Sequence, residues 1–108
     1  MTLTFKQGDT HNAIVSVLEK KEGNGEFVPI KLNDCKVYIS VSGRVEKDEC
    51  TILDAERGKV SYLISNISDK SGFYNYEFIV SYSDGTEEII PNQSYKKVRI
   101  YNNLEGEI

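Results

Sequence analysis

Apolar and polar residues alternate with a period of two along much of this chain, the pattern of a strand with one buried face. In residues 36–42, Val37, Ile39 and Val41 would point one way, and the intervening side chains the other. Residues 59–64 repeat the alternation. Residues 74–82 do so too, with one face made of Tyr74, Tyr76, Phe78, Val80 and Tyr82. Because β-branched and aromatic residues fill these runs, we expect half-buried strands.

Turn residues divide the rest of the chain into further short strands. The sequence EGNG at 22–25 predicts a hairpin between residues 12–20 and an edge segment at 27–32, where Pro29 cannot donate to a ladder. Turns are also expected at 42–43, 56–58 and 83–85, and Pro91 ends a strand at 86–90. The last strand is predicted at 95–101. Residues 64–71 resemble a crossover with one helical turn.

About seven or eight short strands, with turns roughly every ten residues, are typical of an all-β sandwich or barrel. The 108-residue length fits one domain. We expect that domain to cover residues 1–101, followed by a polar tail at 102–108.

One local pattern narrows the fold to an immunoglobulin-like, antiparallel Greek-key sandwich. A turn and Gly72 precede Tyr74, which stands two residues before an inward-facing Tyr76. This is the arrangement of a tyrosine corner, in which the hydroxyl returns to the backbone a few residues upstream. The alternative is two ordinary strand tyrosines.

The charge and hydropathy of the chain exclude several classes of function. With a net charge of −4, the chain lacks the basic balance that a nucleic-acid-binding protein needs. No apolar run approaches the roughly 20 residues needed to span a bilayer. The N-terminus lacks the pattern of a secretion signal, so we expect synthesis and folding in the cytoplasm. Cys35 and Cys50 are then expected to be free thiols, although a disulfide across neighbouring strands is geometrically possible.

Candidate chemistry is sparse, and we expect neither an enzyme nor a cofactor. The single histidine, His11, lies in a polar stretch beside Asp9 and Thr10, where sequence neighbours on a strand would point to opposite faces. The cysteines lack the spacing of a zinc site, and the acidic loop residues lack the order of a calcium loop. We therefore predict no catalytic, cofactor-binding or metal-binding residues.

Seven tyrosines and no tryptophan suggest a surface for binding. Tyrosines at outward positions, such as Tyr38 and Tyr95, would suit a protein interface or the stacking of sugars. The alternative is that most of them complete the core.

The order of motifs resembles the amino-terminal domain of phage baseplate upper proteins. The resemblance is carried by LTFKQGDT at 3–10, by 31–32 leading into 37–39, by CTILDAERGKVSY at 50–62 and by SGFYNYEF at 71–78; residues 84–86, Pro91 and 98–100 complete the order. It spans almost the whole of residues 3–101. It implies an immunoglobulin-like fold, a place in the tail tip or baseplate of a virion, and a role in assembly or host attachment, with no catalytic residues. Members of this family usually continue into a helical linker and a receptor-binding or fibre-anchoring region, and this sequence departs from them by ending at Ile108.

The resemblance makes other phage tail or baseplate proteins the expected partners, within an assembly that contains several copies of this chain. Two sheet edges are candidate docking surfaces, since an edge accepts a partner's strand. One is the segment at 27–32. The other is the last strand, with the residues Tyr95, Lys96, Lys97, Arg99 and Tyr101. A carbohydrate-binding module that uses exposed tyrosines on a cell surface is the alternative; no partnership with nucleic acid or membrane is expected.

Overall fold

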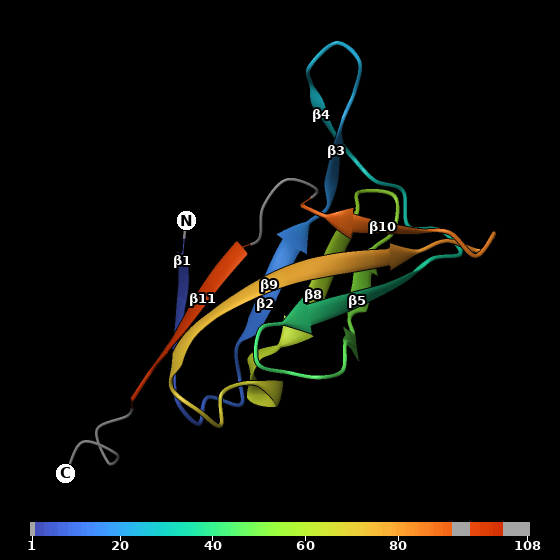
Figure 1. Cartoon of the computed structure of the whole chain (residues 1–108). Coiled ribbons are helices and arrows are strands. Elements are labelled where there is room, and N and C mark those ends of the chain that lie inside the picture. The colour runs from blue at the N-terminus through green and yellow to red at the C-terminus, as the bar shows by residue number, and fades with distance from the viewer. Residues whose placement is uncertain (1, 92–95, 103–108) are drawn as a thin grey trace.

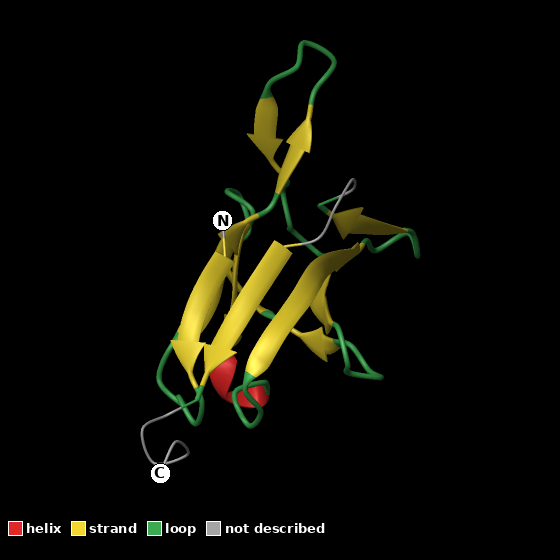
Figure 2. Cartoon of the chain, turned by 60° about the vertical axis from the view of Figure 1, so that its left-hand side comes forward, coloured by secondary structure: helices red, strands yellow, loops and turns green. Residues whose placement is uncertain are grey.

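The computed structural model describes residues 2–91 and 96–102 and has two facing sheets and a projecting hairpin (Figures 1 and 2). The large sheet runs in the order β1 (Thr2–Lys6), β11 (Lys96–Tyr101), β9 (Gly72–Ser81), β5 (Lys36–Val41) and β6 (Asp48–Glu49), with β10 (Glu87–Ile90) also paired to β9. The small sheet is β2 (Ala13–Val17), β8 (Lys59–Leu63) and β7 (Thr51–Asp54). The hairpin is β3 (Glu19–Lys21) and β4 (Phe27–Pro29).

The core lies between the two sheets and is built from the alternate residues that the sequence pattern selects. Val37, Ile39 and Val41 of β5 are buried, as are Tyr76, Phe78 and Val80 of β9 and Ile14, Val60 and Tyr62 of the small sheet. The rings of Tyr76 and Phe78 meet edge to face, with centroids 5.8 Å apart. Because inward and outward residues alternate, each strand presents its other face to solvent.

The prediction of an all-β chain is confirmed, and the helical turn expected within residues 64–71 is present as η1 (Ile64–Asn66). This short turn is the helical part of the described chain, and no described helix could cross a membrane. The described residues form more strands than predicted. Strands β1, β6 and β7 were not predicted. Strands β6 and β7 are short and flank turns, so their alternation is too brief to identify, whereas β1 has a clear alternation that was not used in the prediction.

The sheets are antiparallel, as predicted, except for one strand pair. Strand β1 runs parallel to β11, with Thr2 opposite Lys97 and Lys6 opposite Tyr101. The other described strand pairs are antiparallel. Strand β1 joins the large sheet while β2, the next strand, belongs to the small one. The strand with which β1 pairs is therefore set by long-range packing, and the alternation of apolar and polar residues cannot predict it.

The last strand is not a sheet edge, which corrects the prediction that it accepts a partner's strand. Strand β11 lies between β1 and β9 and is hydrogen-bonded to both. A strand paired on both sides has no free row of amides and carbonyls to offer. Tyr95, the first residue predicted for that edge, lies outside the described residues, as do residues 103–108 of the predicted tail.

The first predicted strand, at 12–20, divides at Leu18. The Leu18 amide donates to the carbonyl of Gly58, and the Leu18 carbonyl accepts from the amide of Ile30. A Cβ on Gly58 would lie 2.7 Å from the carbonyl oxygens of both Leu18 and Ile30, so only glycine fits there. Beyond this crossing the chain leaves the small sheet, and residues 19–29 form an exposed arm that points away from the sandwich (Figures 1 and 2).

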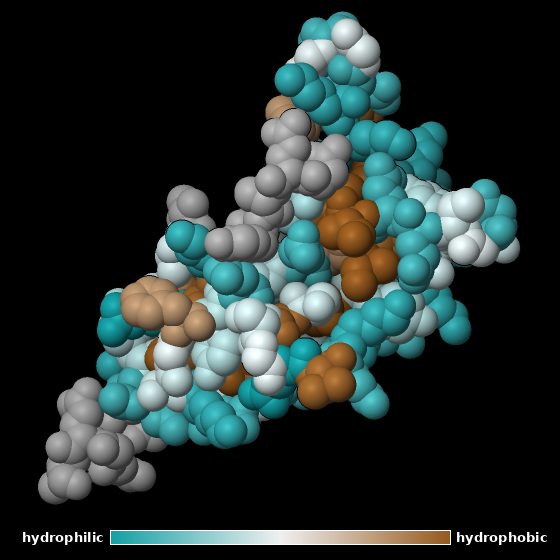
Figure 3. Space-filling model, in the orientation of Figure 1, coloured by the Kyte–Doolittle hydropathy of each residue, from teal (hydrophilic) through white to brown (hydrophobic). Residues whose placement is uncertain are grey.

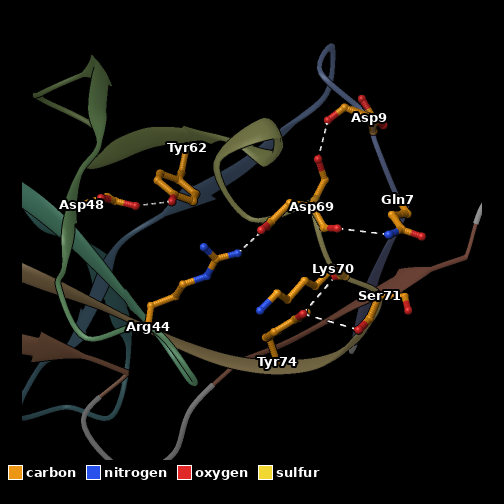
Figure 4. A network of polar contacts seen from close by, with 10 residues as sticks. Gln7, Asp9, Arg44, Asp48, Tyr62, Asp69, Lys70, Ser71 and Tyr74 are labelled. Atoms are coloured by element: carbon orange, nitrogen blue, oxygen red, sulfur yellow. Dashed lines mark hydrogen bonds and ion pairs between the residues drawn. The ribbon is translucent and has the colours of Figure 1, made fainter.

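The connection before β9 has the hydrogen bond expected of a tyrosine corner. The Tyr74 hydroxyl donates to the carbonyl of Lys70 at 2.9 Å and lies 3.4 Å from that of Ser71 (Figure 4). Gly72, which lies between Ser71 and Tyr74 in the sequence, has a φ of 145°, which disfavours any residue with a side chain. Tyr76, two residues further on, is buried in the core.

The same connection is tied to the turn between β1 and β2. The Gln7 side-chain amide donates to the carbonyl of Asp69 at 3.0 Å, and the Ser68 hydroxyl donates to the carbonyl of Asp9 at 2.8 Å. The Asp69 carboxylate forms an ion pair with Arg44, from the loop after β5 (Figure 4). These contacts join three loops at one end of the sandwich, next to the place where β1 meets β11.

Candidate functional site

The outer surface of β1, β11 and the start of β9 carries a cluster of basic and aromatic side chains. We call it the arginine–aromatic face and define it as Lys6, Phe73, Lys97, Arg99 and Tyr101. Register brings these residues together, since Arg99 lies opposite Phe73 on one side of β11 and Tyr101 lies opposite Lys6 on the other. All of them point away from the core, whose β11 contribution is Val98 and Ile100.

The centre of this face is a guanidinium held against two rings. The Arg99 guanidinium carbon lies 4.4 Å from the centroid of Phe73 and 4.1 Å from that of Tyr101. The Lys6 ammonium lies 5.8 Å from the same Tyr101 ring. Phe73 is 67% exposed and Tyr101 39% exposed, so the rings that hold Arg99 also offer surface to a partner. Stacking orders the guanidinium while its N–H donors remain available.

The arginine–aromatic face is a basic area on an acidic protein. Among the described residues, no ion pair involves Lys6, Lys97 or Arg99. Five other cations of the described chain are paired with carboxylates, Arg44 with Asp69 and Lys47 with Glu87 among them. With a net charge of −4 overall, this local excess of positive charge would attract a carboxylate or another acidic group of a partner.

An aliphatic row crosses the same sheet further along. Register places Ile89 of β10 opposite Ile79 of β9, which lies opposite Tyr38 of β5. Ile89 is 50% exposed, and the space-filling view shows hydrophobic surface in the middle of this side of the molecule (Figure 3). The ammonium of Lys47 lies 4.6 Å from the centroid of the Tyr38 ring. An apolar area with charged groups around it is the usual composition of a protein interface.

The structure brings together part of the predicted docking residues. Lys97, Arg99 and Tyr101 share the outer face, whereas Lys96 begins the strand opposite Tyr76. Sequence reasoning missed Phe73 and Lys6, because their neighbours on the sheet come from the far ends of the chain. The only indication in the sequence was that both residues alternate with inward-facing ones and so should point outward.

The segment predicted as the other docking edge, at 27–32, divides into two parts. Strand β4 is exposed and, among the described strands, pairs with β3 alone, which leaves its other edge unpaired there; Phe27 is 64% exposed. Ile30 and Leu32 turn inward and are buried. Residues 27–29 are therefore part of the exposed arm, and residues 30–32 connect the arm to the core.

The groups that might carry chemistry are dispersed. Both cysteines are free thiols, as expected, and burial raises the pKa of Cys50 to about 12, which keeps its sulfur protonated at neutral pH. His11 is exposed, and its backbone amide donates to the Asp9 carboxylate at 2.8 Å. In the described chain, no three histidine, cysteine or acidic residues are grouped so that they could hold a metal ion.

The described tyrosines do not form an exposed stacking platform. Tyr62 and Tyr76 are buried, and the Tyr62 hydroxyl donates to Asp48. The Tyr82 hydroxyl donates to Glu88 at 2.7 Å, and burial together with this bond raises the Tyr82 pKa to about 12. Tyr101 is the most exposed tyrosine of the described chain, and cations occupy its surroundings. This arrangement gives no particular support to sugar stacking.

No protein-family model matches the chain, and no curated protein matches it.

Proposed function

We propose that this chain is an immunoglobulin-like structural module of a phage tail tip or baseplate, which docks onto neighbouring virion subunits and supports assembly or host attachment. The virion assignment rests on the motif order that resembles the baseplate upper protein family. The docking role rests on the arginine–aromatic face.

Strand order supports the immunoglobulin-like part of the proposal. In that fold one sheet holds strands B, E and D, and the other holds G, F and C, with C′ beside C in variable-type domains. The order β2–β8–β7 corresponds to B–E–D, and the order β11–β9–β5–β6 corresponds to G–F–C–C′. The bond from Tyr74 to Lys70 then lies at the start of strand F, where a tyrosine corner belongs. Tyr76 takes the position of the second core cysteine of antibody domains.

The single observation that carries the docking role is the Arg99 stack between Phe73 and Tyr101. Arginine and aromatic residues dominate the energy of many interfaces. Aromatic side chains bury a large area at a small cost in conformational entropy, and a guanidinium already stacked on them has less freedom left to lose. Here a cation lies on exposed rings with no carboxylate partner among the described residues. An acidic, partly apolar patch of a neighbouring subunit is the complementary surface.

Purified particles test both parts. The experiment replaces the gene for this chain in its phage or prophage with one encoding an epitope-tagged copy, then quantifies that copy in gradient-purified virions and locates it by gold labelling. We expect label at the tail tip or baseplate. Particles that assemble without the chain would refute the virion assignment.

A pair of charge reversals tests the face. Arg99→Glu should lower incorporation at least about tenfold, because it places a like charge against an acidic partner. Arg57→Glu is the matched control: its side chain is 84% exposed and lies in the turn between β7 and β8, away from the large sheet. Equal incorporation of both variants would leave the chain in the virion but remove this face from the docking contact.

A further inference from the structure

The outer edge of strand β2 is unpaired among the described residues, and the hydrogen bonds to β8 show which of its amides and carbonyls face that edge. In the order β2–β8–β7, β2 has β8 on one side and no described strand on the other. The Asn12 carbonyl accepts from Ile64, and the Leu18 amide donates to Gly58. Since hydrogen-bonding direction alternates along an antiparallel strand, the amides and carbonyls of Ala13, Val15 and Val17 face outward.

Every other described edge carries a feature that discourages strand pairing. Strand β6 is two acidic residues, and β7 is interrupted by a register shift and ends at Asp54. Strand β3 consists of charged residues, β4 ends in Pro29, and β1 ends in Lys6. Strand β10, which pairs with β9 on one side, is four residues long and begins with Glu87 and Glu88. Charges, prolines, bulges and short length are the means by which proteins protect their edges. Strand β2, with the sequence AIVSV, has none of these.

The solvent face beside this edge is aliphatic as well. Val15 is 50% exposed and Val17 43% exposed, and Leu63, opposite Ala13 on β8, is 54% exposed. The outward amides and carbonyls therefore adjoin exposed aliphatic side chains, and an incoming strand would bury both.

We propose that β2 pairs with β2 of a second copy of this chain, antiparallel and centred on Val15. The pairing places Val15 opposite Val15 and Ala13 opposite Val17, so the outward amides and carbonyls of these three residues meet their counterparts. Both copies keep their aliphatic faces on the same side, and the two small sheets become one continuous sheet. The proposal concerns a surface separate from the arginine–aromatic face and does not depend on the proposed function.

A second copy fits this edge better than an unrelated partner because the edge is self-complementary. Two acidic chains repel each other wherever their charges approach, and opposed like charges on paired strands are destabilising. Strand β2 contains no charged residue, so the two-fold pairing opposes no charges within the strand. Valine opposite valine is also a favourable cross-strand pair.

The mass of the whole chain in solution, measured by light scattering over a range of concentrations, tests the pairing. We expect the mass to rise towards twice the 12.2 kDa of one chain. Val15→Lys should raise the dissociation constant at least about tenfold, since it opposes two lysines at the two-fold axis. Leu53→Lys is the matched control, because Leu53 is 51% exposed at an outward position of β7, at the far edge of the same sheet. It should leave the mass unchanged.

Residue-resolved amide exchange supplies a second, independent measurement. The amides of Ala13, Val15 and Val17 should become protected as concentration rises, while those of Ile14 and Ser16, already bonded to β8, should stay constant. A monomer at all concentrations would overturn the proposal. The proposal would also be overturned if Val15→Lys and Leu53→Lys weakened the dimer equally, because the copies would then associate through the faces of their small sheets. A dimer that Arg99→Glu dissociates would overturn it too, because the contact would then lie on the arginine–aromatic face.

Discussion

Strands β2 and β11 belong to opposite sheets of the sandwich, and each buries alternate residues, among them Ile14 of β2 and Ile100 of β11. Their outer faces differ. Strand β11 carries Lys97 and Arg99 and is paired on both sides, whereas β2 carries only valines and alanine and is paired on one. The chain therefore places its charges on a strand whose backbone is satisfied, and leaves uncharged the strand whose backbone is open. Interaction through side chains and interaction through the backbone are separated in space.

The buried residues of β2 and β11 should contribute equally to stability, and truncating them is the change from which we expect the largest effect. Ile14→Ala and Ile100→Ala should each lower the free energy of unfolding by about 2–5 kcal/mol, through lost burial and the cavity left behind. Urea titrations of both variants measure the loss. A loss below 1 kcal/mol at either position would show that one strand packs more loosely than its burial indicates.

If β1 is weakened, β11 should lose its pairing on one side and become an edge strand, as β2 is. Phe5 is half-buried against the core, so Phe5→Ala should cost about 1–3 kcal/mol, less than the removal of a fully buried ring. Amides of β11 that bond to β1 should then exchange faster, while those that bond to β9 keep their protection. Uniform acceleration across β11 would mean that β1 and β9 hold it as one cooperative unit.

The hydrogen bond of the Tyr74 hydroxyl should contribute less, because it is exposed. Tyr74→Phe removes the donor to the Lys70 carbonyl and should cost about 0.5–1.5 kcal/mol. Tyr101→Phe is the control, since within the described residues no hydrogen bond involves its hydroxyl. If chemical denaturation finds equal losses for the two variants, the Tyr74 hydrogen bond does not support the loop between η1 and β9.

The smallest effect concerns the ion pair that links this loop to the one after β5. The hydrogen bond from Arg44 holds the pKa of Asp69 below its usual 3.8. A carboxylate with a lowered pKa in the folded state stabilises the fold at pH values above its unfolded pKa, and this contribution is lost as the pH falls through the folded value. The melting temperatures of the native chain and Asp69→Asn should therefore converge as the pH falls below 3.8, and differ slightly at neutral pH. A constant difference across that range would contradict the pairing.

Much of the fold was accessible from alternation and turn chemistry. The strands predicted at 36–42, 59–64 and 74–82 overlap β5, β8 and β9, and the pattern around Gly72 predicted a hydrogen bond from Tyr74 to the backbone upstream, which the structure has. The candidate docking face was only partly accessible. Lys97, Arg99 and Tyr101 were identified from the last strand, but as members of an edge. Phe73 and Lys6 could not be added, because their distance from Arg99 along the sequence carries no information about register.

The sequence by itself determined which residues face inward, since a period of two and the need to bury apolar area leave little choice along each strand. It also determined that no charge would lie on β2. Only the tertiary structure decided which edges are open. The first strand pairs with β11 and not with β2, and such pairing depends on contacts between residues nearly a hundred positions apart. That one pairing covers the last strand and exposes the second.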